Sequence, residues 1–452
     1  MRLTLLFSCC TMSLLLSCSQ PEKPVQANQP VLQKALSDEA LTTLVQKQTF
    51  QYFWDGAEPI SGLARERFHS DNEYPVHDKD IVTSGGSGFG VMAILVGIER
   101  GFITRQEGFE RLKKNVDWLE KCDRFHGVWP HWWTGATGKV YPFSKKDDGG
   151  DLVETSYLVQ GLLCVRQYFK DGNEEEKALA GRIDALWKAV EWDWHRGPNK
   201  ENVIYWHWSP NFGWEMNFKI HGWNECLITY VLAACSPTHG VPAEVYHEGW
   251  AQNGAIVLDK PLEKYGYNLA LRHQAGPNYG GPLFWAHYSF LGLDPRHLKD
   301  KYANYWEQNK NQVLIDFEYC VENSKNCKGY GKNCWGLTSS YSMKGYAGHM
   351  PDEDLCVISP TAALSSFPYT PEQSTAAMRH FYEDLGNKLW GEYGFYDAFS
   401  EQNDWWIPRY LAIDQGPVVV MMENYKSGLL WNLFMSCPEV QAGLTKLGFE
   451  YK

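Results

Sequence analysis

Acidic residues stand where three apolar helical segments of the chain begin. Asp147, Asp151 and Glu154 open one segment, Glu225 opens a second and Asp414 opens a third. The first three are four and then three residues apart, so a helix would bring their carboxylates to one face of its first turn. A carboxylic acid can protonate a leaving glycosidic oxygen while a carboxylate activates water, so converging carboxyls of this kind suit glycoside hydrolysis.

Helix capping is a simpler explanation for any single one of these acids, because Asp and Glu are favoured at helix N-termini. Three groups of acids, each at the start of an otherwise apolar segment, favour a shared site instead. Clustered acids also raise one another's pKa, which keeps a proton donor protonated near neutral pH. We therefore expect a group of catalytic carboxyls, with the polar residues Asn224 and Gln415 beside two of them to bind the ligand.

Aromatic residues are concentrated in the long segments that precede these acids. They make up 15% of the 452 residues and include 20 tryptophans. Packing within loops accounts for any single one, but a groove lined with flat faces that stack on sugar rings fits the set better. The residues expected to contact a glycan are Trp132, Trp133, Trp208, Trp214, Tyr279, Trp405, Trp406 and Arg409.

Two kinds of helical segment alternate along the chain. The amphipathic, charged ones cover residues 37–55, 104–122, 173–195, 242–253, 295–323 and 371–389. The nearly charge-free ones cover residues 88–98, 151–168, 225–234, 282–291, 360–367 and 416–435. A helix that is apolar on all sides is buried on all sides. Six outer helices alternating with six inner helices predict an all-α fold, the (α/α)6 toroid.

The connections between these segments have unequal lengths. Those from inner to outer segments are short, as at residues 100–103 and 236–241, whereas those from outer to inner segments are long. The long loops must then share the end of the toroid where the inner helices begin, together with the acids and aromatics. Long loops in a compact domain are usually functional. We expect small hairpins within them and a single catalytic domain over residues 36–452.

The first 35 residues predict export. Residues 3–16 are apolar and follow Arg2, and the run from Leu15 to Cys18 resembles a bacterial lipobox. We expect a lipoprotein signal peptide over residues 1–17, lipidation of Cys18 and a flexible tether over residues 18–35. The alternative is an ordinary signal peptide that contains cysteine. The lipid would be the only membrane attachment of an exported protein, in the periplasm or at the outer membrane of a Gram-negative bacterium.

Charge and cysteine content narrow the range of partners. The formal net charge of −12 gives no excess of basic residues to bind nucleic acid and favours a neutral glycan over a polyuronate.

Nine of the twelve cysteines follow the leader and its Cys18, an odd number that cannot all pair. Cys320, Cys327 and Cys334 lack the paired spacing of a strong zinc site, so a disulfide or free thiols are favoured. We expect a monomer without a metal.

Several long motifs resemble the bacterial glycoamylase-like family, glycoside hydrolase family 144, whose characterised members include endo-β-1,2-glucanases. They are GGSGFGVMAILVGIERG at 85–101, DGGDLVETSYLVQGLL at 148–163, WNECLITYVLAACSP at 223–237, YGGPLFWAHYSFLGLD at 279–294 and AIDQGPVVVMMENYKSGLLWNLFM at 412–435. The resemblance runs from about residue 40 to the end of the chain. It implies an (α/α)6 fold and an inverting mechanism without a cofactor.

The same resemblance assigns roles to the acids. Glu225 of the NEC stretch would be the general acid, and Asp414 of the IDQGP stretch would be the general base acting through water. Asp151 is a third catalytic candidate, and Asp147 and Glu154 would bind the glycan or tune the others. The leading expectation is a lipid-anchored hydrolase of β-1,2-glucan or β-1,2-glucooligosaccharides. The alternatives are a hydrolase of α-glucan or another β-glucan on the same fold, and a non-catalytic glycan-binding lipoprotein.

Overall fold

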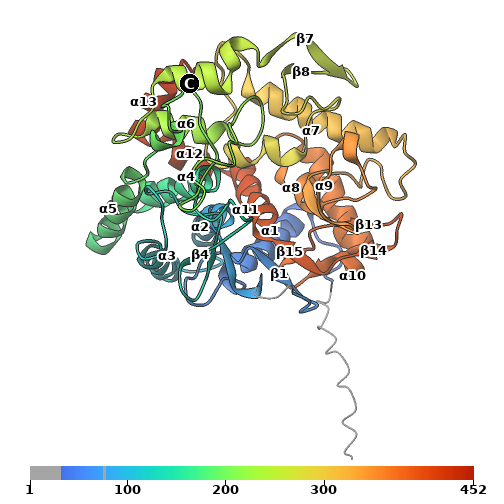
Figure 1. The fold of residues 1–452 in the computed structure, drawn as a ribbon. Coiled ribbons are helices and arrows are strands. Elements are labelled where there is room, and N and C mark those ends of the chain that lie inside the picture. The colour runs from blue at the N-terminus through green and yellow to red at the C-terminus, as the bar shows by residue number, and fades with distance from the viewer. Residues whose placement is uncertain (1–31, 75–77) are drawn as a thin grey trace, which may run out of the picture.

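The computed structural model describes residues 32–74 and 78–452 (Figure 1). The expected signal peptide, Cys18 and most of the expected tether lie outside the described residues. The described chain is rich in helices, with short strands between them. None of its helices is both long and apolar enough to cross a membrane.

Five of the six charge-free segments form buried helices. These are α2 (Ser84–Glu99), α4 (Leu152–Phe169), α6 (Leu227–Cys235), α8 (Pro360–Ser365) and α11 (Ala412–Lys426), the last followed by α12 (Leu429–Met435). Helix α2 packs between α4 and α11, while α6 packs on α4 and α8 on α11. A Cβ atom on Gly88 of α2 would lie 2.2 Å from the carbonyl oxygen of Tyr157 in α4. Glycine therefore lets these two buried helices approach at backbone distance.

The remaining charge-free segment differs from the expected helix over residues 282–291. It consists of two 3-10 turns, η5 (Leu283–Ala286) and η6 (Tyr288–Phe290), which meet at His287. Side chains from neighbouring helices bond its carbonyl groups: Gln160 of α4 donates to Tyr288 O over 3.1 Å, and Trp431 of α12 donates to Phe290 O over 2.7 Å. These bonds replace those that an α-helix would make internally, so the buried backbone stays satisfied.

The amphipathic segments form the surrounding helices. They are α1 (Asp38–Trp54), α3 (Arg105–Leu119), α5 (Glu174–Lys188), α7 (Tyr305–Glu322) and α9 (Pro371–Arg379). Helix α9 continues into the π-helical η8 (His380–Asp384) and α10 (Gly386–Leu389). The segment expected at 242–253 is the π-helical η3 (Val245–Trp250) followed by η4 (Gln252–Gly254). An additional helix that the sequence pattern did not indicate, α13 (Pro438–Leu447), packs on α6.

The first helix lies against the last of the long buried helices. Gln46 of α1 donates to the carbonyl oxygen of Val419 in α11 over 3.1 Å, across 373 residues of sequence. Figure 1 shows α1 beside α11 near the middle of the molecule. Helix α1 also packs on α2. The N-terminal and C-terminal parts of the described chain are therefore in direct contact through α1 and α11.

Short antiparallel strands occupy the long loops. The pairs are β1 (Arg67–His69) with β15 (Arg409–Leu411), β5 (Gly150–Asp151) with β6 (His207–Trp208), β7 (Val257–Lys264) with β8 (Tyr267–Leu271), β9 (Ser339–Ser342) with β10 (Gly345–Gly348), β11 (Trp390–Gly391) with β12 (Gly394–Phe395), and β13 (Phe399–Ser400) with β14 (Trp405–Trp406). A three-stranded sheet joins β2 (Ile81–Thr83), β3 (Trp132–Thr134) and β4 (Lys139–Tyr141). The remaining 3-10 turns are η1 (Asp78–Asp80), η2 (Trp194–Arg196) and η7 (Pro351–Glu353).

Three of these strands run directly into buried helices. Strand β2 ends where α2 begins, β5 where α4 begins and β15 where α11 begins. Each is paired with a strand from another loop, so the hydrogen bonds of the ladder fix the start of the helix relative to distant parts of the chain. Two of these helix starts carry acids, Glu154 in α4 and Asp414 in α11, and the strand pairing therefore fixes their positions.

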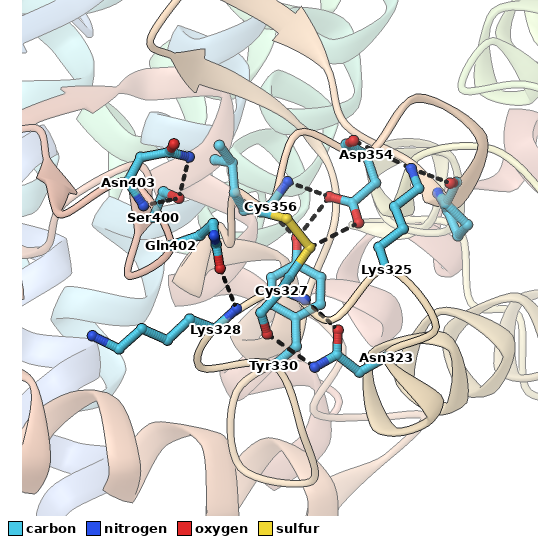
Figure 2. The surroundings of a disulfide bond; sticks show 12 residues. Asn323, Lys325, Cys327, Lys328, Tyr330, Asp354, Cys356, Ser400, Gln402 and Asn403 are labelled. Carbon is cyan, nitrogen blue, oxygen red and sulfur yellow. Dashed lines mark hydrogen bonds between the residues drawn. A yellow bond between two sulfur atoms is a disulfide. The ribbon is translucent and has the colours of Figure 1, made fainter.

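A disulfide joins Cys327, in the loop after α7, to Cys356, in the loop before α8 (Figure 2). Asp354 lies beside it, and one oxygen of its carboxylate accepts both the backbone N–H of Cys356 and the hydroxyl of Tyr330 over 2.8 Å. Of the three cysteines considered from the sequence, Cys327 is thus in a disulfide. Cys320 and Cys334 are buried free thiols, as are the other cysteines of the described residues: Cys122, Cys164, Cys226, Cys235 and Cys437.

Candidate active site

A cavity of about 390 Å³ opens where the strand-to-helix junctions meet. Three of its wall residues are glutamates, and many of the others are aromatic. The residues that line it are Glu66, Arg67, Thr83, His131, Trp132, Phe143, Glu154, Tyr157, Trp206, Glu225, Phe284, Tyr288, Tyr341, Tyr346, Leu411 and Ile413. Carboxyl groups in an aromatic cavity are what the hydrolysis of a glycan requires.

Glu225 lies on the wall of this cavity, just before α6. The side chain of Asn224 accepts the N–H of Cys226 over 2.9 Å and donates to Gln274 over 2.7 Å, which fixes the turn that presents Glu225. Burial raises the pKa of the Glu225 carboxyl to about 7, and the charges of Glu154 and Asp151 add to this effect. Glu225 can therefore carry a proton near neutral pH, as a general acid must. Asn224 itself is buried and serves the turn rather than the cavity wall.

Glu154 stands in the first turn of α4 and also faces the cavity. Its Oε2 atom accepts the backbone N–H of Gly85 in α2 over 2.8 Å. Burial raises the pKa of Glu154 to about 7; the nearby acid Asp151 adds to the rise, while His131 opposes it. The Nε2 atom of His131 lies 3.9 Å from Glu154 Oε1. Two glutamates with raised pKa values thus share one cavity.

Asp151, the third catalytic candidate, is fully buried and does not line the cavity. Its Oδ1 atom accepts the N–H of Glu154 over 2.9 Å as the cap of α4. Its Oδ2 atom accepts hydrogen bonds from His131 and Trp206, each over 3.1 Å. Burial opposes ionisation, but the neighbouring His207 and His131 outweigh it and lower the pKa of Asp151. This fully occupied carboxylate holds the residues around it in place.

Asp147 belongs to the same buried cluster. Its carboxylate lies 3.8 Å from His131 Nδ1 and 3.4 Å from His207 Nδ1, and it does not line the cavity. Burial alone would lower the pKa of His131, but Glu154, Asp151 and Asp147 together raise it to about 10. His131 is therefore an imidazolium on the cavity wall, next to Glu154.

Asp414, in the first turn of α11, adjoins the cavity without lining it. It is only 3% exposed, and its Oδ1 atom accepts the hydroxyl of Tyr288 over 3.1 Å. Burial and the neighbouring carboxyl of Asp397 raise the pKa of Asp414 well above its usual range. Its neighbour Ile413 is on the cavity wall. The next residue, Gln415, is buried and donates to the carbonyl oxygen of Phe395 over 3.0 Å, which anchors a loop.

Two acidic residues at this site were not singled out by the sequence. Asp397 is fully buried between β12 and β13, and its Oδ2 atom accepts the N–H of Tyr341 over 2.8 Å. Glu66 is on the cavity wall and forms an ion pair with Arg67, which also pairs with Asp78 over 3.3 Å. Both acids lie in loops where no helical periodicity marks them.

Only one of the aromatic residues expected from the sequence lines the cavity. Trp132 does so, beneath the Arg67 guanidinium at 5.7 Å. Trp133 points to the other face of β3 and is fully buried against Trp118, away from the cavity wall. The alternation of side chains along a strand explains why two neighbouring tryptophans differ in this way.

The other expected contact residues lie elsewhere. Trp208 and Trp214 pack around Trp194 with ring centroids 6.0 and 6.3 Å apart, respectively. Tyr279 packs against Tyr319, and Arg409 pairs with Asp71 over 3.1 Å. Trp406 stacks on Phe399 and lines a separate pocket with Lys388. Trp405, its neighbour in β14, packs on a small cluster that includes Val357 and Ala398. None of these side chains is on the wall of the cavity.

Different aromatic side chains provide exposed faces at the cavity. Phe143 is 51% exposed and stacks on His131 with centroids 4.3 Å apart. Trp206 stacks almost parallel on Phe218, with centroids 5.1 Å apart. Tyr346 of β10 is 59% exposed and lines the cavity from the β9–β10 hairpin. The sequence marks these residues only as members of aromatic-rich loops.

Two groups of side chains offer the atom types that bind metals. His131, Asp147 and Asp151 form one, and Cys334, His380 and Glu401 form the other, with the ligand atoms of each group within 4.8 Å of one another. In the first group the Nδ1 atom of His131 lies 3.1 Å from Asp151 Oδ2 and 3.8 Å from Asp147 Oδ2, so the ring pairs with the two carboxylates. The second group is not on the cavity wall.

Comparison with known proteins finds relatives over most of the chain. Residues 217–438 match a family model described as "Glycoamylase: Putative glucoamylase". The structure of an endo-β-1,2-glucanase from Chitinophaga pinensis, in complex with sophorotriose and glucose, is 66% identical with a TM-score of 0.90. That match covers 92% of this chain and 99% of the other.

Two further relatives carry different names. A structure from Bacteroides fragilis, described as a putative glucoamylase, is 62% identical with a TM-score of 0.90 and covers 94% of this chain and 100% of that one. An exo β-1,2-glucooligosaccharide sophorohydrolase (non-reducing end) from Parabacteroides distasonis is 47% identical over 430 residues, which is 91% of this chain. The match covers 58% of that curated relative, so this chain spans little more than half of its length.

Proposed function

Because this chain belongs to the glycoamylase-like family, whose members include β-1,2-glucan-active glycoside hydrolases, we propose that it hydrolyses β-1,2-glucan or β-1,2-glucooligosaccharides. The observation that carries the proposal is the pair of glutamates, Glu154 and Glu225, on one aromatic cavity wall with pKa values of about 7. A binding protein has no need for a buried carboxyl that is still protonated at neutral pH. A glycosidase needs one to protonate the leaving group.

In this proposal Glu225 is the general acid. Its proton passes to the glycosidic oxygen as the bond from that oxygen to the anomeric carbon breaks. Asp414 is the general base, which takes a proton from the water that attacks the anomeric carbon from the opposite face. Glu154 binds sugar hydroxyls beside the His131 imidazolium, and Asp151 and Asp147 position His131. Attack by water gives inversion at the anomeric carbon.

We infer an (α/α)6 toroid as the architecture behind this site. Outer and inner segments alternate at all twelve expected places, although two of the twelve are 3-10 or π-helical. The inner elements contact one another in sequence from α2 through α4 and α6 to η6, and from α8 through α11 back to α2. His287, between η5 and η6, contacts Ser366 just after α8 with a hydrogen bond of 3.0 Å, which supports closure of the ring.

Product analysis tests the proposed activity. The protein is incubated separately with linear β-1,2-glucan and with maltooligosaccharides, and the products are separated by thin-layer chromatography. Short β-1,2-linked products from the first substrate alone support the proposal, and their sizes report endo or exo attack. Glucose from maltooligosaccharides alone would instead support an α-glucan hydrolase, the activity that the glucoamylase descriptions name. Binding without products would favour a glycan-binding protein.

We also propose that Cys18 carries a lipid that tethers the protein to a membrane through residues 19–35. The support is the run from Leu15 to Cys18 and the charge-poor segment that follows. Labelling with a fatty acid in the producing bacterium tests this, with Cys18→Ala as the variant that should lose both the label and membrane fractionation. Retention of the label by the variant would contradict it.

A further inference from the structure

Three side chains from separate parts of the chain converge near the disulfide-bonded loop. They are Cys334 in the loop after α7, His380 at the start of η8 and Glu401 directly after β13. One atom of each, the thiol sulfur, a ring nitrogen and a carboxylate oxygen, lies within 4.8 Å of the other two. None of the three residues lines the cavity that holds Glu154 and Glu225, so the proposed hydrolysis makes no use of them.

His380 is oriented by a carboxylate. Its Nδ1 atom lies 2.7 Å from Oδ2 of Asp384, four residues further along the chain. Because a carboxylate only accepts, Nδ1 is the protonated nitrogen, and the lone pair of the ring is on Nε2. A histidine that binds a metal ion through one nitrogen usually donates its other N–H to a carboxylate in this way, which fixes the ring and its tautomer.

The loop after α7 is held against the segment that carries Glu401. A Cβ atom on Gly329 would lie 2.3 Å from Glu401 Oε1, and the φ of Gly329 is +94°, which favours glycine. Next to this contact, the backbone N–H of Lys328 donates to Gln402 Oε1 over 3.0 Å (Figure 2). The disulfide ties the same loop to the segment before α8. The fold therefore fixes the backbone on two sides of the group.

The thiol of Cys334 is buried close to these polar side chains. Cys334 is 2% exposed, and its sulfur makes neither a disulfide nor a hydrogen bond with the residues that the structure describes. A buried cysteine ordinarily packs as a small apolar residue, whereas this sulfur lies within 4.8 Å of a carboxylate oxygen and a ring nitrogen. The nearby Lys388 pairs with Asp404 over 3.0 Å and leaves the charge of Glu401 without a cation.

The atom types and separations suit a zinc ion. Tetrahedral Zn²⁺ binds sulfur at about 2.3 Å and nitrogen or oxygen at about 2.0–2.2 Å, which places the ligand atoms roughly 3.4–3.6 Å apart. The three atoms, which are at most 4.8 Å apart, reach this spacing by small side-chain rotations. Thiolate and imidazole favour Zn²⁺ over Mg²⁺ and Ca²⁺, which prefer oxygen. A pocket of about 260 Å³, lined by Glu401 and Asp384, gives water access to a fourth position.

We propose that Cys334, His380 and Glu401 bind one Zn²⁺ ion, with water as the fourth ligand and Asp384 as the positioning residue of His380. On binding, the S–H bond of Cys334 breaks, a sulfur–zinc bond forms and the proton passes to solvent. The ion holds the loop after α7, η8 and the β13–β14 hairpin together and takes no part in hydrolysis. Sequence spacing does not reveal the site, because each ligand comes from a different segment.

Titration with Co²⁺ tests the site in the full chain, after treatment with a chelator and with the disulfide left oxidised. Co²⁺ occupies tetrahedral zinc sites, and a thiolate bound to it adds an intense near-ultraviolet band. We expect one equivalent of Co²⁺ to produce this band and one equivalent of Zn²⁺ to remove it. Zn²⁺ at about 100 times its dissociation constant should also raise the melting temperature by about 3 °C.

Four variants separate this site from general metal binding. Cys334→Ser should lose the near-ultraviolet band and lower the affinity for Zn²⁺ at least 100-fold. Cys122→Ser is the matched control, because Cys122 is also a buried free thiol but belongs to no such group of ligands, and it should keep both. Glu401→Gln should lower the affinity at least tenfold. Asp384→Ala should keep the band and lower the affinity roughly 10- to 100-fold, as loss of an orienting carboxylate does.

The outcomes are distinguishable from those of the hydrolysis assay, because no glucan is present. Absence of the thiolate band in the wild type, or a band of equal size in Cys334→Ser, would overturn the proposal. If Cys334→Ser does not fold, an unchanged Zn²⁺ affinity in Glu401→Gln, whose side chain is partly exposed, would overturn it equally. Zn²⁺ binding that is lost in Asp147→Asn but kept in Cys334→Ser would place the ion at the His131 group instead.

Discussion

Glu154 Oε2 accepts the backbone N–H of Gly85 over 2.8 Å, so the first turn of α4 is bonded directly to the first turn of α2. A Cβ atom at position 85 would lie 2.3 Å from the same Glu154 oxygen, so a side chain there would displace the carboxylate. The glycine-rich stretch at the start of α2 therefore serves the carboxylate, and the geometry of Glu154 depends on a residue that has no side chain.

Substitution of Gly85 by alanine should disturb catalysis more than folding. The new methyl group would push the Glu154 carboxylate away, and displacement of a catalytic-site group by about 1 Å can cost roughly 100-fold in rate. We expect kcat/KM on β-1,2-glucan to fall between roughly 10-fold and 100-fold. Gly181→Ala in α5 is the control, since no atom lies within 4 Å of its Cβ position, and it should keep full activity. Equal activity of the two variants would contradict this account.

Replacement of Glu225 by glutamine should abolish hydrolysis while binding of the oligosaccharide remains. Glu225→Gln keeps the size of the side chain but cannot donate a proton to the leaving oxygen, and loss of a general acid costs roughly 10²- to 10⁴-fold. The measurement combines kcat on β-1,2-glucan with calorimetric titration of an oligosaccharide. Glu215→Gln, which changes a surface glutamate paired with Lys146, is the comparison. Activity near wild type in Glu225→Gln would reassign the acid.

The free energy of unfolding should depend on pH because of the Glu225 carboxyl. The folded-state pKa of Glu225, about 7, exceeds its usual value of 4.5 because of burial. A group with a raised pKa stabilises the fold fully below its unfolded pKa, and this contribution is lost as the pH rises through the folded pKa. Between pH 4 and pH 8 the wild type should therefore lose up to about 3 kcal/mol of unfolding free energy relative to Glu225→Gln. Urea unfolding of the wild type and of Glu225→Gln at pH 4 and at pH 8 measures this difference. An equal change in unfolding free energy in the two proteins would contradict the prediction.

Two adjacent tryptophans should give opposite phenotypes. Trp132 lines the cavity, so Trp132→Ala should raise KM roughly tenfold with little loss of stability. Trp133 is fully buried, so Trp133→Ala should cost about 3–5 kcal/mol of stability. Melting temperatures and Michaelis constants of the two variants can be compared directly. A large KM effect at Trp133 in a stable variant would contradict the placement of the two side chains.

The disulfide should contribute stability without affecting the chemistry. It closes a loop between Cys327 and Cys356, 29 residues apart, which corresponds to about 3–4 kcal/mol in the chain-entropy account. Neither cysteine lines the cavity. We expect the double variant Cys327→Ser/Cys356→Ser to melt at a lower temperature and to keep wild-type kcat under conditions where it is folded. Reductant should lower the melting temperature of the wild type but not that of the variant.

The helix-rich fold follows from periodicity where helices are regular. The apolar runs that became α2 and α4 and the amphipathic run that became α3 were predicted to within four residues of their observed bounds, whereas the run expected to continue to residue 195 ends as α5 at Lys188. The segment around His287 was mispredicted because its carbonyl groups bond the side chains of Gln160 and Trp431, and no local pattern reveals such distant partners. The toroid itself stays a prediction that the helix contacts support.

The site was only partly predictable. Glu225 and Glu154, which stand out in the sequence as acids at the start of apolar helices, both lie on the cavity wall. Asp397 was not singled out because it lies in a loop, where no helical periodicity marks it. Most of the aromatic residues expected to stack on sugar do not line the cavity, for a related reason. Aromatic content indicates which loops are aromatic, but the direction of each side chain depends on strand register, as Trp132 and Trp133 demonstrate.

The contact between α1 and α11 has a consequence for biosynthesis. Gln46 bonds Val419 across 373 residues, so the first helix has no partner on α11 until nearly the whole polypeptide has left the ribosome. Closure of such distant contacts is slow, and transiently exposed apolar surface promotes aggregation. The newly made chain must therefore remain without its final packing until synthesis is almost complete, which is also the condition in which a polypeptide can be threaded through a secretion channel.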